Sequence, residues 1–144
     1  MQTSPFVSAE KPAVTGHSFA VQTYEACAGC HPNPAGLIDL AFDSVTMSID
    51  AVKKALDTWA LTKAPPQLQK YGILAWEYTT IGELSSGGPG PNSQEQALIP
   101  DNIKKARFNM YVVQNDGSFG VHNGRFALDL LDAAQSWVLT ELNK

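Results

Sequence analysis

The chain contains two cysteines, Cys27 and Cys30, which are separated by two small residues and followed directly by His31. The order C-x-x-C-H is the sequence through which haem c is attached to proteins. The thiols add to the two vinyl groups along one edge of the porphyrin, and the adjacent histidine then reaches the iron. We therefore predict one covalent haem c, held by thioethers from Cys27 and Cys30, with His31 as the proximal iron ligand.

Two other interpretations of the cysteine pair need features that the sequence lacks. A dithiol redox centre would follow a strand and precede a helix in an α/β pattern. A zinc site would need at least one further pair of cysteines or histidines at short spacing. The remaining histidines, His17 and His122, lie far apart, and there are no other cysteines. The motif therefore favours haem attachment.

The length of 144 residues is sufficient for one domain with its own core. We expect an extended N-terminal segment over 1–15, where Pro5 and Pro12 lie, and a single monohaem cytochrome c domain over 16–144. The net charge of −4 and the scattered Lys and Arg residues argue against a nucleic-acid partner. No apolar stretch approaches the roughly 20 residues of a transmembrane segment.

The first residues show no basic start followed by an apolar run, so no secretory signal is visible. Haem c is attached outside the cytoplasm, where cysteines can be delivered reduced to an assembly machinery. We therefore expect that a leader has been removed and that the protein is periplasmic or extracellular.

Apolar residues recur with helical periodicity, and no alternating pattern of useful strand length is present. Pro32 and Pro34 predict the end of the short segment that carries the cysteines, because proline cannot continue a helix. Ser48 is suited to be the N-cap of a helix that begins at Ile49 and ends before Pro65.

The second half of the chain also contains helical patterns. Helices are expected over 68–84, over 99–114 and from Asn123 to Leu142, and a Gly- and Pro-rich loop is expected over 85–96. The predicted fold is all-α, a small helical bundle around one covalently attached haem that is wedged into its core.

The second axial position of the iron decides the function, and the residues leave four candidates: His17, His122, Met47 and Met110. Both methionines lie in apolar helical segments, where Met ordinarily fills the core. His122 follows a glycine-containing turn that could direct its side chain to the iron from the side opposite His31. His17, ten residues before Cys27, could fold over the haem.

Several segments resemble the last haem module of multihaem cytochromes c, the relatives of cytochrome c nitrite reductase and the octahaem cytochromes. The likeness rests on 16–19 before the attachment motif and on 106–113 and 116–123 near the C-terminus. It spans 16–138. In those families the histidine of the G-V-H-N stretch is a distal haem ligand, which implies His122 here, with His17 as the alternative.

The relatives carry several haems, whereas this chain has one attachment motif. One of the two histidines is therefore either unused or reaches a haem in another subunit.

Together these features predict an electron-transfer cytochrome with bis-histidine iron rather than an enzyme. The expected partners are redox proteins, which include other cytochromes or subunits of a complex. The alternatives are an open iron site that acts as a gas sensor or small-molecule reductase, and a structural haem subunit of a larger assembly. Arg107 is a candidate partner for a haem propionate.

Overall fold

The computed structural model describes residues 25–121 and 123–144. Their regular structure is entirely helical, and they contain no strand, as the sequence predicts. The α-helices are α1 (Glu25–Ala28), α2 (Pro34–Thr62), α3 (Asp101–Asp116) and α4 (Gly124–Leu142). Two 3₁₀ segments, η1 (Pro66–Trp76) and η2 (Glu95–Leu98), lie between α2 and α3.

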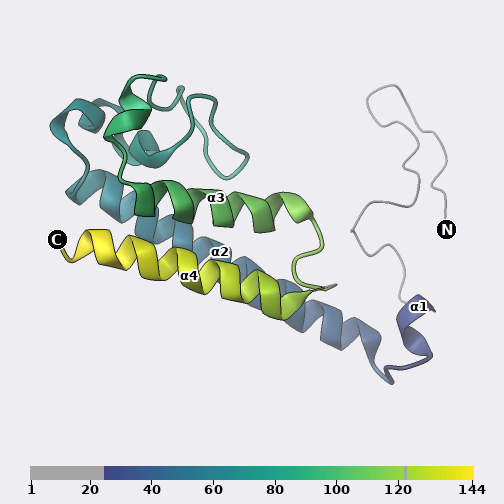
Figure 1. Ribbon diagram of the computed structural model, residues 1–144. Coiled ribbons are helices and arrows are strands. Elements are labelled where there is room, and N and C mark those ends of the chain that lie inside the picture. Colours follow the sequence, from purple (N-terminus) through teal and green to yellow (C-terminus); the bar gives the residue numbers. More distant parts are fainter. Residues whose placement is uncertain (1–24, 122) are drawn as a thin grey trace, which may run out of the picture.

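The helices α3 and α4 pack against each other and against the C-terminal part of α2, whose first turns extend beyond them (Figure 1). The segment between α2 and α3 covers one end of this bundle, and α1 lies at the opposite end, beside the start of α2. Apolar side chains from all three helices and from η1 fill the core, and the largest fully buried ones are Trp59, Trp76, Leu56, Leu68, Ile103, Met110 and Leu131. Among the described residues, no helix has the length and apolar character needed to cross a membrane.

Helix α2 begins 15 residues earlier than the sequence predicts, at Pro34 instead of Ile49. Asn33 is the N-cap, and its side-chain oxygen accepts a hydrogen bond from the Gly36 amide at 3.1 Å. Proline is well suited to the first helical position, because it needs no hydrogen bond from its nitrogen there. The expected N-cap, Ser48, lies inside the helix, and its hydroxyl donates to the Ser44 carbonyl at 2.9 Å. Pro34 therefore starts this helix.

The segment over 68–84 does not form the expected α-helix. It is a 3₁₀ segment that ends at Trp76 and is kinked at Gly72, whose φ of 54° lies in the left-handed region. The chain then continues as irregular structure. At the start of this structure, the indole N–H of Trp76 donates a 2.9 Å hydrogen bond to Asp57 and so attaches the segment to α2. Contacts with the rest of the fold, and not the helical pattern of the sequence, therefore determine the path of this segment.

The last two helices agree with the prediction within a few residues. Helix α3 ends at Asp116 and is followed by Gly117, which adopts the left-handed conformation with φ 70°. Asn123 occupies the N-cap position of α4, which ends at Leu142 as expected. The reversal between the two helices places their apolar stripes against each other and against α2.

Candidate haem attachment site

The cysteine motif lies on a single helical turn. The backbone amides of Cys30 and His31 both donate to the Cys27 carbonyl, at 3.2 and 3.0 Å, so the turn continues past the end of α1. Neither cysteine is in a disulfide, Cys27 is half-buried, and Cys30 and His31 are exposed. This geometry places two unpaired thiols and one imidazole within one turn, which is the donor set that covalent haem attachment requires.

A small hollow of about 120 Å³ adjoins this turn, and its lining is mostly apolar: Cys27, His31, Pro34, Leu37, Ile38, Ala41 and Val121. The residues from α2 are spaced as one face of its first two turns. Pockets that enclose a small molecule usually measure ~300–1,000 Å³. The hollow therefore fits one edge of a flat, apolar group beside the cysteines, and the described residues would not enclose that group.

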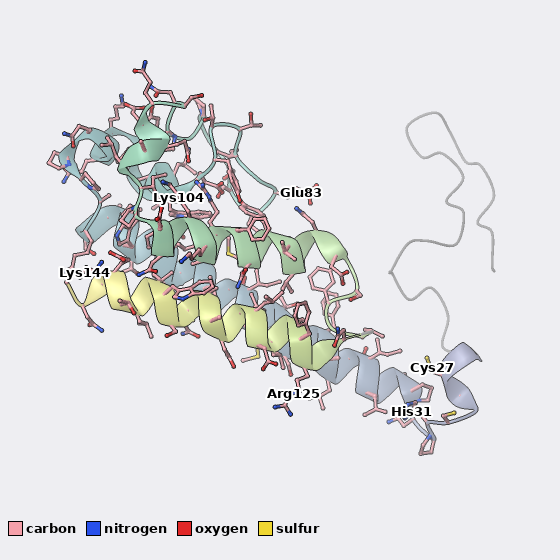
Figure 2. The ribbon with its side chains drawn as sticks, in the orientation of Figure 1. Cys27, His31, Glu83, Lys104, Arg125 and Lys144 are labelled. Atoms are coloured by element: carbon pink, nitrogen blue, oxygen red, sulfur yellow. The ribbon has the colours of Figure 1, made fainter. Side chains whose placement is uncertain are left out.

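The position of the site corrects the expectation of a haem within the bundle core. Figure 2 shows Cys27 and His31 at the far tip of α2, at the opposite end of the molecule from Lys144. The core between α2, α3 and α4 is filled by side chains, which include two tryptophans that are at most 2% exposed. A close-packed interior of this kind leaves no room for a porphyrin.

The turn between α3 and α4 brings Val121 to the hollow. Phe119 has a positive φ of 46°, and its ring packs on Phe42 of α2 with 4.6 Å between centroids. Gly120 follows with φ 83°, and a Cβ atom on it would lie 2.8 Å from a methyl carbon of Val45. Only glycine permits so close an approach without a shift of its neighbour. The turn is thereby held against α2 immediately before position 122.

The two candidate distal histidines, His17 and His122, both lie outside the described residues. The alternative ligands from the sequence analysis do not reach the hollow. Met110 is fully buried in the core, and Met47 is 72% exposed on α2. Neither methionine lines the hollow with Cys27 and His31. The structure thus gives no support to methionine ligation from within this part of the chain.

The side chain of Arg107 bonds to groups in the protein interior and is not placed to bind a haem propionate at the cysteine turn. Its guanidinium donates to the Trp76 carbonyl at 2.7 Å and to the Gln96 side chain at 3.0 Å. It also stacks on the ring of Tyr78, 3.8 Å from the centroid. Burial lowers the pKa of Arg107 below its ordinary value. The expectation of a propionate partner at this position is therefore wrong.

A buried carboxylate beside Arg107 was not anticipated from the sequence. Glu77 is 0% exposed, and its side chain accepts from the hydroxyls of Tyr111 and Ser85, each at 2.5 Å, and from the Tyr78 amide at 3.1 Å. Burial, followed by the hydrogen bond to Glu77, raises the pKa of Tyr111. This network fixes the irregular segment after η1 to α3 and lies away from the cysteine motif. In the sequence, Glu77 is flanked by Trp76 and Tyr78, and this pattern could have indicated a buried carboxylate.

Within residues 25–121 and 123–144, no group of three or more His, Cys, Asp or Glu side chains is placed to hold a bare metal ion. The cysteine turn therefore remains the one candidate cofactor site that sequence and geometry both indicate in this part of the chain. No protein-family model, no curated protein and no solved structure matches the chain.

Proposed function

We propose that this chain is an electron-transfer module that carries one haem c. Cys27 and Cys30 would form the thioethers, and His31 would be the proximal iron ligand. The observation that carries the proposal is the single turn that presents both free thiols and the imidazole beside an apolar hollow. The haem iron would supply one-electron redox chemistry, and the chain's own residues would hold the ring and set its surroundings.

We further propose His122 as the distal ligand, with His17 as the alternative. Val121 lines the hollow together with Cys27 and His31, and the turn that carries it is held on α2 by the Phe119–Phe42 contact. Val121 therefore lies at the hollow beside the cysteine turn, and His122 follows it in the sequence. Two histidine ligands would close the iron to small molecules and favour electron transfer over gas binding or reduction.

The shallow hollow also bears on the mechanism. Only one edge of a haem would be covered by the described residues, so its remaining edge would be available to a redox partner. Outer-sphere transfer needs such an exposed edge and no residue that makes or breaks bonds. Covalent haem attachment would place the protein outside the cytoplasm, in the periplasm or the extracellular space.

A second candidate, a haem subunit within a larger cytochrome assembly, is favoured by one feature of the same region. Leu37 and Leu40, one turn apart near the start of α2, are 49% and 64% exposed. Contiguous exposed apolar residues of this kind often mark a contact with another molecule. A neighbouring haem protein would cover both these side chains and the open haem edge.

The proposal is tested by producing the chain in a host that matures c-type cytochromes and measuring its intact mass under denaturing conditions. We expect the mass of one haem to be added to the chain. The combined change of Cys27→Ala and Cys30→Ala should abolish the addition, and either change alone should leave one thioether at most. Met47→Ala is the matched control, because it removes an exposed sulfur side chain from α2 outside the hollow. A chain without added haem, in cells that mature other cytochromes, would refute the proposal.

A further inference from the structure

One row of side chains on α3 remains exposed or half-buried after the helix has packed. Residues 104, 108, 112 and 116 follow one another at intervals of four, so they form one continuous ridge on the helix surface. Phe108 and Val112 in the middle of this ridge are 59% and 41% exposed. Lys104 precedes them and Asp116, the last helical residue, follows them. We call these four residues the α3 ridge.

The α3 ridge lies between two hollows. One measures about 680 Å³ and separates α3 from the irregular segment that contains Tyr78 and Glu83. The other measures about 280 Å³ and separates α3 from the first turns of α4, at Phe126 and Leu130. Val112 and Asp116 line both hollows. A ridge flanked by grooves is the surface that a second helix ridge can pack into.

Two copies of the α3 ridge that run in opposite directions have complementary residues at each point of contact. In an antiparallel pair of ridges, Lys104 of one copy meets Asp116 of the other, and Phe108 of one copy meets Val112 of the other. A two-fold axis near residue 110 generates all four contacts at once, which is the condition for a closed, isologous dimer.

Neighbouring charges extend this complementarity. Glu83, which Figure 2 labels together with Lys104, lines the same hollow as Asp116, whereas Lys105 lies over the Trp137 ring of α4. Glu83 has no hydrogen-bond or ion-pair partner among the residues that the structure describes. Lys104 has only a 3.7 Å contact with Asp101, whose side chain is 86% exposed. The basic end of one ridge therefore faces the acidic end of the other in the antiparallel pair.

The helix dipole of α3 gives an independent argument for a partner. A carboxylate at the last residue of a helix lies at the negative end of the dipole, where an acidic side chain is unfavourable. No basic residue occupies the last turn of α3 to offset it. The Asp116 carboxylate accepts hydrogen bonds from the amide and hydroxyl of Ser118, and Lys104 of a second copy would add the positive charge that the last turn lacks.

From these observations we infer that the chain forms a two-fold homodimer through antiparallel packing of the α3 ridge against its copy. Phe108 of each copy enters the larger hollow of the other, beside Val112, and Lys104 pairs with Asp116. The inference does not depend on haem attachment, because neither hollow includes the cysteine turn.

Sedimentation velocity of the full haem-loaded chain over a range of concentrations tests the inference. We expect the mass to double with concentration. Phe108→Ser should raise the dimer dissociation constant at least about tenfold, as for an aromatic anchor at the centre of an interface. Leu139→Ser is the matched control, because Leu139 is 46% exposed on α4 outside both hollows and should leave the dissociation constant unchanged.

Charge reversal then tests the antiparallel register. Lys104→Glu and Asp116→Lys should each weaken the dimer about tenfold, and their combination in one chain should restore most of the affinity. Lys54→Glu, at an exposed position on α2, is the control for net charge. Circular dichroism confirms that each variant is folded. A chain that stays monomeric at every concentration would overturn the inference, and so would a dimer that these ridge variants leave unchanged.

Discussion

The two halves of α2 lie in very different surroundings, although they belong to one continuous helix about 44 Å long. The second half packs between α3, α4 and η1, and Ile49, Val52 and Leu56 are each at most 2% exposed. The first half projects past the ends of α3 and α4, and Leu37 and Leu40 are 49% and 64% exposed (Figure 1). We call these regions the body and the tip.

The contrast shows that the two regions are stabilised by different means. Most helical stability in proteins comes from the packing of an apolar face, and the body has that packing. The tip has the Asn33 cap, the continuity of the helix, and the contact between Phe42 and Phe119. Its apolar residues surround the cysteine turn, which is where a haem would cover them. The body is therefore a packed scaffold, and the tip carries the candidate attachment site.

The largest effect should come from a change at the proposed distal ligand. His122→Ala should remove the distal ligand, convert the iron to the high-spin state and allow carbon monoxide to bind, because one coordination position becomes free. Visible absorption with and without carbon monoxide measures this, and the thermal stability of the body should be retained. If His17→Ala has this effect and His122→Ala does not, the distal ligand is His17.

A matched pair of leucines on α2 tests the difference in packing. Leu56→Ala should lower the free energy of unfolding by ~2–5 kcal/mol, because it leaves a cavity in the body. Leu40→Ala should change it by less than about 0.5 kcal/mol, because Leu40 is 64% exposed. Urea unfolding of both variants gives the comparison. Equal losses would mean that the tip is packed as tightly as the body.

A pair of glutamates tests the polar interior of the body. Glu77→Gln should cost ~1–3 kcal/mol of unfolding free energy, because a buried carboxylate that accepts from Tyr111 and Ser85 loses its charge and its hydrogen-bond geometry. Glu83→Gln, at an exposed position a few residues later, should stay within about 0.5 kcal/mol. Guanidinium titrations measure both. A neutral result at Glu77 would show that the network contributes little to the body.

Hydrogen exchange measures local stability in the two halves of α2 directly. Without haem, the amides of 38–44 should exchange at least about tenfold faster than those of 49–60, a difference of ~1.4 kcal/mol in opening free energy. The combined Cys27→Ala and Cys30→Ala variant supplies the haem-free chain. Haem attachment should reduce this difference in exchange rate between 38–44 and 49–60. Protection that is uniform along the helix in the haem-free chain would remove the distinction between body and tip.

The smallest effect concerns acid stability at the covered end of the body. The hydrogen-bonded contact with Lys70, followed by that with Tyr71, lowers the pKa of Glu95 from 4.5 to about 2. Because the folded pKa is the lower one, this stabilisation is complete above pH 4.5 and is lost as the pH falls towards 2. Glu95→Gln should flatten the dependence of the urea midpoint on pH in this window. Glu83→Gln is the control, and an unchanged dependence in Glu95→Gln would contradict the assignment.

The sequence predicted the body well where local signals and packing agree. The end of α3 before Gly117 and both ends of α4 follow from a left-handed glycine, an Asn at the N-cap and an uninterrupted apolar stripe. The segment after Pro65 was predicted less well, because Gly72 and the buried Glu77 network direct its path. Such long-range contacts produce no periodic pattern in the sequence, so they could not be predicted from it.

The predicted start of α2, at the tip, is wrong for a different reason. The sequence pattern predicts that Pro34 ends a segment, although Asn33 before it is a suitable cap and proline is favoured at the first helical position. The cysteine motif identified the candidate attachment residues from spacing alone. The lining by Leu37, Ile38 and Val121 could not be inferred, because it depends on how the turn before position 122 meets α2.

The most direct test of the central claim is the visible absorption spectrum of the purified chain, oxidised and reduced, with and without carbon monoxide. We predict a sharp low-spin haem c spectrum that carbon monoxide does not change and that lacks the band typical of methionine ligation. That result would support one covalent haem with two histidine ligands at the tip of α2. A chain without haem absorption would contradict the account, and a high-spin spectrum that shifts with the gas would contradict the electron-transfer assignment.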